Sequence, residues 1–398
     1  MNNKSIKHYI VVLVCCGLAA SSIGISINSS GIFYTPVSES LGILRGSFSM
    51  HMTIFSLVTA FSAFFIPKIM EKVPYKLILT VSVLVAVLTT GAMAFARTIP
   101  VFYLLGAIRG LSTSFFSIVP LTLIINQWFE KSHGLATSIV FGFSGLAGSI
   151  CSPILSSFIE TLGWQSGYLI KAAIILCLCL PAILYPFHLD PRKDGLLPYG
   201  YSESMKTEQQ SIPAFKFVTI AFISFFIFSL LASCITSFTQ HFPGYGQSLG
   251  YSGATSALLL SAGMIGNVVS KLIIGILSDW LGAMKATIVM IAAIMVGILL
   301  LLTGSNFYLL VAGAFLFGSS YGIGAVSLPL LTKYFFGVNN YARAFPSISF
   351  ASNLGAAISL SMVGYIYDFF GSYFYGFIIA MVMIIVGAGL LMITNHQR

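Results

Sequence analysis

Long apolar runs recur along the whole chain, and each is long enough to cross a lipid bilayer. A membrane-spanning α-helix needs about 20 predominantly apolar residues, because its backbone polar groups must be satisfied within the segment. Of the 398 residues, 57% are hydrophobic and 7% are charged, whereas soluble domains carry about 25% charged residues. A water-soluble fold is therefore excluded. The runs predict twelve transmembrane helices at 9–34, 48–66, 77–95, 101–125, 136–159, 166–187, 214–239, 253–276, 286–303, 308–332, 345–366 and 373–394.

One sizeable hydrophilic stretch, residues 188–213, interrupts these runs with prolines, glycines and charges of both signs. It predicts a cytoplasmic linker between an N-terminal six-helix half (1–187) and a C-terminal six-helix half (214–398). The first run lacks an Ala-x-Ala-like cleavage site, so we expect it to be retained as a span. The predicted class is an all-α integral membrane protein built from two six-helix bundles.

The net charge of +9 is distributed unevenly between the two sets of loops. Only Arg45 and Arg97 lie clearly in the outer set. An excess of Lys and Arg marks the cytoplasmic side, so we expect a multi-pass plasma-membrane protein with both termini in the cytoplasm. The charge is then an orientation signal and indicates no nucleic-acid partner. The inner set comprises Lys4, Lys7, Lys68, Lys72, Lys76, Lys131, Arg192, Lys193, Lys206, Lys216, Lys285, Lys333, Arg343 and Arg398.

The two halves repeat each other weakly at an offset near 208 residues. A constant offset across a whole half is hard to obtain by chance. Parallel six-span repeats with a substrate site between them near the midplane are typical of one kind of secondary transporter. The matches place Ser40-Leu41-Gly42 on Ser248-Leu249-Gly250, Glu71 on Asp279, Arg109-Gly110 on Phe317-Gly318 and Gly163 on Gly371.

The loop between spans 8 and 9 reads Gly275-Ile-Leu-Ser-Asp279-Trp-Leu-Gly282-Ala-Met-Lys285. It resembles the Gly-x-x-x-Asp-x-x-Gly-x-x-basic pattern of the major facilitator superfamily. The copy after span 2 keeps an acid, Glu71, but has prolines in place of both glycines. We interpret five residues as a conformational switch, namely Gly275, Asp279, Gly282, Lys285 and Glu71. In this switch, carboxylates contact helix N-termini and basic groups until the two halves move apart.

Within the superfamily, the chain is similar to the bacterial monocarboxylate transporter and oxalate–formate antiporter family. This resemblance implies a secondary active transporter of a small, monocarboxylate-like organic anion, with a proton or a counter-anion as coupling partner. The residues that carry it are Ser30-Gly31-Ile-Phe33-Tyr34-Thr-Pro36, Leu41-Gly42-Ile-Leu-Arg45-Gly46, Trp128-Phe129 with Gly134-Leu135-Ala136, Gly145-x2-Gly148, Gly163-Trp164 and Gly195-Leu-Leu-Pro198-Tyr-Gly200.

Lys271 lies in the middle of span 8, eight residues before Asp279. At 1.5 Å per residue it lies about 12 Å inside the membrane edge. A lysine at that depth costs about 2.5–3.5 kcal/mol. Asn267, one turn earlier, shares its face. The resemblance implies that a basic residue here pairs with the substrate carboxylate. A lysine held by backbone carbonyls for structure alone is the open alternative.

The other candidates each have two open interpretations. Arg109 in span 4 either binds an anion or serves as a gate, or else is a structural arginine satisfied by span-end carbonyls or Glu160. Lys171 is expected to extend along span 6 to the outer membrane surface. Polar residues in apolar spans are candidate walls of the substrate site or helix-packing groups, namely Asn28, Tyr34, Tyr321 and Asn353. One central cation fits a monoanion better than a dianion.

All ten acidic residues lie at span ends or in loops, so no carboxylate relay is predicted within the membrane. A coupled proton would travel on the substrate or on Lys271, and exchange or uniport fits equally well.

Three other classes compete with an anion carrier. An exporter of drug-like or neutral metabolites is the main alternative, although a cation exporter would be expected to bury an acid. An enzyme would need a metal cluster or a nucleophile with its base, and the sequence shows neither, nor a nucleotide-binding loop. A non-transporting sensor has no signalling domain to support it. We therefore expect a monomer in the bilayer that is not an enzyme and has no cofactor or metal, and whose six cysteines are core residues.

Overall fold

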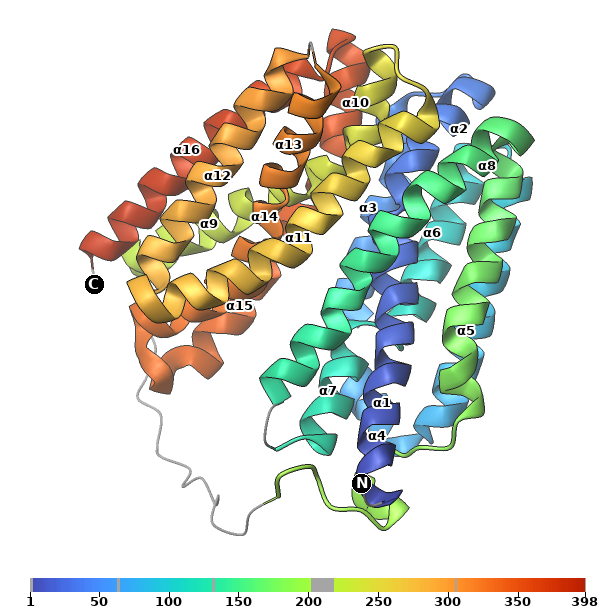
Figure 1. Cartoon of the computed structure of the whole chain (residues 1–398), viewed down its shortest axis with the longest axis vertical. Coiled ribbons are helices and arrows are strands. Elements are labelled where there is room, and N and C mark those ends of the chain that lie inside the picture. The colour runs from blue at the N-terminus through green and yellow to red at the C-terminus, as the bar shows by residue number, and fades with distance from the viewer. Residues whose placement is uncertain (1–2, 63–64, 131–132, 202–217, 305, 398) are drawn as a thin grey trace. The chain divides into compact units, whose positions relative to one another are not determined.

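The computed structural model describes residues 3–62, 65–130, 133–201, 218–304 and 306–397, and the chain is helical almost throughout (Figure 1). Its contacts divide it into two compact units. Unit 1 comprises Met1–Ser30 and Ile54–Gln209, and unit 2 comprises Gly31–Thr53 and Gln210–Arg398. Residues 31–53, which join the first two spans, thus pack with the C-terminal part of the chain.

Unit 1 is built from the earlier helices of the chain, with π-helical turns at Ala20–Asn28. Its core centres on Trp128, Leu79 and Cys179, which are fully buried. The helices are α1 (Asn3–Ala19), α4 (Ile66–Lys72), α5 (Tyr75–Ala92), α6 (Ile99–Ser114), α7 (Ile118–Trp128) and α8 (His133–Leu184).

Unit 2 contains the later helices, and π-helical turns at Ile323–Ser327 separate α14 from α15. Phe225, Phe228 and Phe317 lie in its fully buried core. The helices are α2 (Tyr34–Leu41), the first half of α3 (Arg45–Ser62), α9 (Ile220–Ser237), α10 (Phe242–Ser248), α11 (Gly253–Leu281), α12 (Ala283–Thr303), α13 (Phe307–Phe317), α14 (Ser319–Gly322), α15 (Leu328–Phe370) and α16 (Phe374–His396).

The spans of the structure agree with the twelve predicted ones. Among the described residues, ten helical segments are long and apolar enough to cross a membrane, and the bent pair α3 and α4 makes up to eleven. The segment Ile139–Leu184 has 46 residues, or about 69 Å as one helix, roughly twice the hydrocarbon thickness. Gly163 breaks it with φ 84° and ψ 161°. Each predicted span therefore has a helical counterpart, and the protein is an all-α integral membrane protein.

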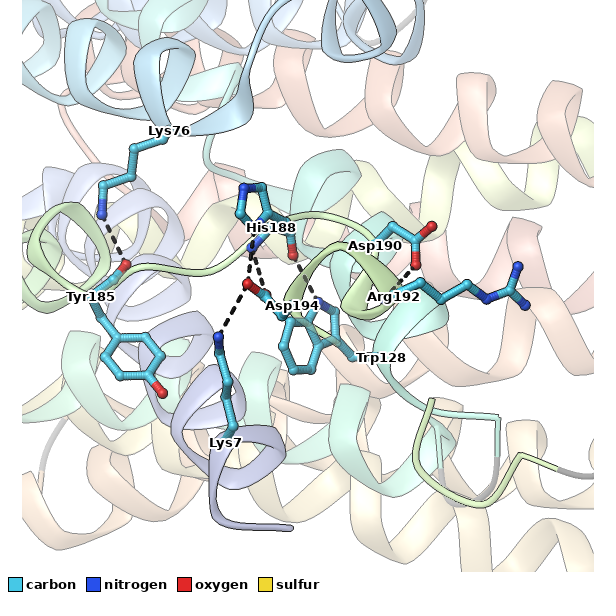
Figure 2. A network of polar contacts seen from close by, with 8 residues as sticks. All are labelled: Lys7, Lys76, Trp128, Tyr185, His188, Asp190, Arg192 and Asp194. Atoms are coloured by element: carbon cyan, nitrogen blue, oxygen red, sulfur yellow. Dashed lines mark hydrogen bonds and ion pairs between the residues drawn. The ribbon is translucent and has the colours of Figure 1, made fainter. Parts of the chain in front are cut away.

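The start of the predicted linker is fastened to unit 1 by a polar network (Figure 2). The Asp194 carboxylate accepts hydrogen bonds from the backbone N–H and Nδ1 of His188, at 3.1 and 2.8 Å, and pairs with the Lys7 ammonium at 3.2 Å. The indole N–H of Trp128 donates to the His188 carbonyl at 3.0 Å. The backbone of Tyr199 pairs with Trp128. Residues 185–201 therefore form an ordered strap.

Candidate functional site

Lys271 occupies the interior of an uninterrupted α11, partly buried, with Asn267 one turn before it. The predicted shared face is therefore present. In the part of the chain that the structure describes, the Lys271 ammonium makes no hydrogen bond or ion pair. An amide stands at the preceding turn where an acid would neutralise the charge. The positive charge is available to an anion.

Asn267 is 2% exposed and packs against the junction of α13 and α14. A Cβ on Gly318, which joins α13 to α14, would lie 2.8 Å from the backbone nitrogen of Asn267. The backbone of α11 therefore touches the chain at this junction. The Asn267 Oδ1 has no hydrogen-bond partner among the described residues. A buried carbonyl oxygen without a donor is costly, and a ligand with a hydroxyl or N–H group would satisfy it.

Tyr321 joins this region through a polar cluster that the sequence did not reveal. Its hydroxyl lies 2.9 Å from Thr239 Oγ1 and also interacts with the Gln240 side chain. The Gln240 Oε1 accepts the backbone N–H of Gly31 at 3.2 Å. The predicted seventh span ended at residue 239, whereas the helical segment Ile220–Ser248 continues past it. The adjacent polar residues Gln240 and His241 were the signal that could have indicated the cluster.

The two remaining unit 2 candidates differ in burial. Tyr34 is 1% exposed, and its ring lies 4.9 Å from the ring of His241. His241 is also buried, and its Nε2 donates to the Leu360 carbonyl at 2.8 Å. Asn353 is exposed on α15. Tyr34 belongs to the buried aromatic core near α2, whereas Asn353 remains accessible.

Arg109 and Asn28 lie in unit 1. Arg109 is 1% exposed, with its guanidinium 5.4 Å from the Phe55 ring centroid and its Nη1 3.4 Å from the Met93 sulfur. Its Nη2 has no hydrogen-bond partner among the described residues. The Asn28 Nδ2 donates to the Ser144 carbonyl at 3.4 Å, within the π-helical turns of the first span.

The expectation that Lys171 reaches the membrane surface is wrong. Lys171 is 1% exposed, and its ammonium donates to Ser30 Oγ at 3.1 Å. The lysine turns inward because the interior of unit 1 supplies a hydroxyl partner, whereas a side chain directed outward would have to cross apolar surroundings. Arg109 and Lys171 are thus both buried within unit 1.

The switch residues lie at helix ends. Gly282 ends α11 with φ 83° and ψ 155°, a conformation that strongly favours glycine. Asp279 and Lys285 flank this break, and both are exposed. Glu71 is exposed on α4. Among the described residues, no ion pair or hydrogen bond of the Asp279 or Glu71 side chain is formed.

An apolar groove of about 710 Å³ lies in unit 1 between α1 and both halves of α8, lined by Leu13, Phe143 and Leu184 among others. It contains none of the predicted site residues. The groove is therefore not the candidate site.

The described residues thus show two helical units with separate cores, built from segments that can cross a membrane, and a lysine without a described partner inside one of these segments. The chain belongs to the Major Facilitator Superfamily, whose family model matches residues 14–359. The predicted superfamily is thereby confirmed.

Its curated relatives are distant and varied. The chain is 26% identical over 186 residues to the MFS-type transporter pynF of Aspergillus niger, covering 46% of this chain and 39% of that relative. It is 24% identical over 318 residues to monocarboxylate transporter 12 of Mus musculus, covering 72% of this chain and 64% of that relative. The chain thus spans less than two thirds of the length of either.

Solved structures share the fold. A bacterial homolog of the human lysosomal transporter Spinster, in an inward-facing and unoccupied conformation, aligns with a TM-score of 0.76, 13% identity and coverage of 100% of this chain and 98% of that one. The nucleoside transporter NupG aligns with a TM-score of 0.72, 14% identity and coverage of 97% and 99%. At these identities the likeness concerns the fold alone.

Proposed function

We propose that the protein is a secondary carrier of a small organic monoanion that works by alternating access. Lys271 binds the anionic group, and the unpaired state of its ammonium is the observation that carries this proposal. Retaining an uncompensated lysine inside a span costs about 2.5–3.5 kcal/mol. A substrate carboxylate would offset that cost each time it binds.

Polar groups on the same helix and on neighbouring helices of unit 2 support a proposal for how the rest of the substrate is held. Asn267 offers an unsatisfied oxygen to a hydroxyl or N–H group, and the Tyr321–Thr239 pair offers hydroxyls beside it. Such a site suits a small hydroxy- or keto-acid with one carboxylate. Arg109 and Asn28, both in unit 1, are further candidate substrate-binding residues.

The proposed conformational cycle uses the helix break at Gly282. The exposed Asp279, Lys285 and Glu71 contact opposing helix ends in one state and separate in the other, with Gly275 in the preceding turn. We further propose a plasma-membrane location, cytoplasmic termini, halves at 1–187 and 214–398 about the 188–213 linker, and a monomer.

Transport by purified protein in liposomes tests the proposal. Labelled lactate, acetate, formate and oxalate are loaded in turn, with and without a counter-anion or a pH gradient. Lys271→Gln is expected to lower uptake of the preferred monoanion about 100-fold, because it removes the charge that pairs with the carboxylate. Lys271→Arg retains part of the uptake.

Lys193→Gln is the matched control, since Lys193 is exposed in the strap outside the spans. It should transport normally. The same panel includes a nucleoside and a neutral amphipathic drug, because export of drug-like or neutral metabolites is the alternative function. Transport of those compounds at the same rate by Lys271→Gln, without any anion transport by the unaltered protein, would overturn the proposal.

A further inference from the structure

A carboxylate from one end of the chain caps a helix near the other end. The Asp368 Oδ1 accepts the backbone N–H of Arg45 at 3.0 Å, and its Oδ2 accepts that of Gly46 at 2.7 Å. These N–H groups open α3 and have no partner within the helix. A negative charge is favourable at this end of a helix. Asp368 therefore supplies both the hydrogen bonds and the charge that the start of α3 needs.

The Arg45 side chain extends over the same segment. Its guanidinium lies 4.1 Å from the Tyr367 ring centroid, and its Nη1 donates to the Tyr373 hydroxyl at 3.2 Å. Its Nη2 pairs with Glu39 at 3.1 Å, but the Glu39 side chain is 68% exposed. Arg45 itself is 8% exposed. Aromatic and hydroxyl groups of residues 367–373 thus hold a largely buried cation.

Further contacts continue down α3 for two turns. A Cβ on Gly364 would lie 2.7 Å from the Gly46 Cα, so the two backbones touch there. The Thr53 hydroxyl lies 2.6 Å from Ser361 Oγ and donates to the Ala357 carbonyl at 2.8 Å. These contacts, together with those of Arg45 and Asp368, join residues 45–53 to residues 357–373, all within unit 2.

This arrangement has a mechanical consequence. The helix α3 is one helix from Arg45 to Ser62, yet residues 45–53 belong to unit 2 and residues from Ile54 belong to unit 1. A continuous α-helix does not bend sharply without a proline, a glycine or an inserted bulge. Residues 50–57 contain neither proline nor glycine. Residues 45–53 would therefore leave their contacts with residues 357–373 as a straight segment, without a sharp bend in α3.

We propose that the contacts between residues 45–53 and 357–373 form a latch that closes the carrier at the α2–α3 end, with Asp368 as its principal charged group. The inference rests on the proposed alternating-access cycle. When the latch is closed, the site is shut at this end. Opening it separates Asp368 from the start of α3 and exposes Thr53, which is 6% exposed in this structure.

Cysteine labelling tests the latch without any substrate. Thr53→Cys is introduced into a Cys177→Ser background, and its reaction with a soluble maleimide is timed for purified protein in lipid nanodiscs. Adding Asp368→Asn should raise the labelling rate about tenfold, because a charge-assisted cap is lost. Adding Glu39→Gln is the matched control and should change the rate little, since the Glu39 carboxylate is exposed. An unchanged rate with Asp368→Asn in a monodisperse protein would overturn the latch.

Cross-linking gives a second, independent test. Thr53→Cys with Ser361→Cys places two thiols where hydroxyls now touch, and oxidation should join them. Since the cross-link holds the latch shut, it should stop transport of whichever compound the liposome assay identifies, and a reductant should restore it. Normal transport by the cross-linked protein would contradict the latch. Labelling and cross-link formation need no anion, so failure of the monoanion proposal would leave both results interpretable.

Discussion

Three cations inside helical segments show how the surroundings of a side chain decide its role. Arg45 is held by Tyr367, Tyr373 and Glu39. Lys171 donates to Ser30. Lys271 makes no hydrogen bond or ion pair with any residue that the structure describes. All three carry a desolvation cost, and the lack of a described partner for Lys271 is what the proposed anion-binding role requires.

A single methyl group should disrupt the close backbone contact at Gly31. A Cβ there would lie 1.7 Å from the Gln240 carbonyl oxygen, so Gly31→Ala is expected to lower stability by about 1–3 kcal/mol. Thermal unfolding of the detergent-solubilised protein measures the effect. Gly389→Ala in α16 is the control, because a Cβ there meets nothing within 4 Å. Equal melting temperatures for both variants would contradict the packing described for Gly31.

At the scale of elements, the strap of residues 185–201 depends on one carboxylate. Burial raises the pKa of Asp194, but hydrogen bonds from His188 and the Lys7 ammonium outweigh it and hold the pKa below its ordinary value of 3.8. A carboxyl with a lowered pKa stabilises the folded state above its ordinary pKa and loses that contribution as the pH falls through the lowered value. The strap is therefore an acid-sensitive element.

We expect Asp194→Asn to lower the stability of the protein by about 1 kcal/mol near neutral pH, since it removes one ion pair and weakens the hydrogen bonds from His188. Melting temperatures measured from about pH 7 down to about pH 3 check this. The difference between the variant and the unaltered protein should shrink below about pH 4. Asp190→Asn, in the same strap, is a control for general effects of lost charge. A difference that stays constant over the whole range would contradict the assignment.

At the scale of the whole molecule, the described residues make an even number of spans when α3 and α4 count as one span and Gly163 divides Ile139–Leu184 into two. An even number of crossings returns both termini to one side, and the lysine and arginine distribution predicts that this side is the cytoplasm. Epitope tags at the two ends of the chain should both become reactive only after cells are permeabilised. Thr98→Cys, beside Arg97, should label in intact cells. A tag detected on intact cells would contradict the topology.

The positions of the spans and the position of Lys271 inside one of them follow from local properties of the sequence. Span length depends on consecutive apolar residues, and the face shared by Lys271 and Asn267 depends only on the helical repeat, so neither requires knowledge of distant contacts. The superfamily was predictable because the pattern from Gly275 to Lys285 is also local.

The tertiary structure alone decided which polar groups meet. Asp368 and Arg45 are 323 residues apart, and nothing in either neighbourhood indicates the other. The inward turn of Lys171 depends on a hydroxyl from the first span, and the Tyr321–Thr239 contact depends on how α14 lies against the end of α9. Apolar runs determine where a chain crosses the membrane, but the register and rotation of packed helices determine which rare polar side chains find partners. In this protein the proposed latch contains charged groups that have partners, whereas the proposed substrate site contains a lysine without a described partner.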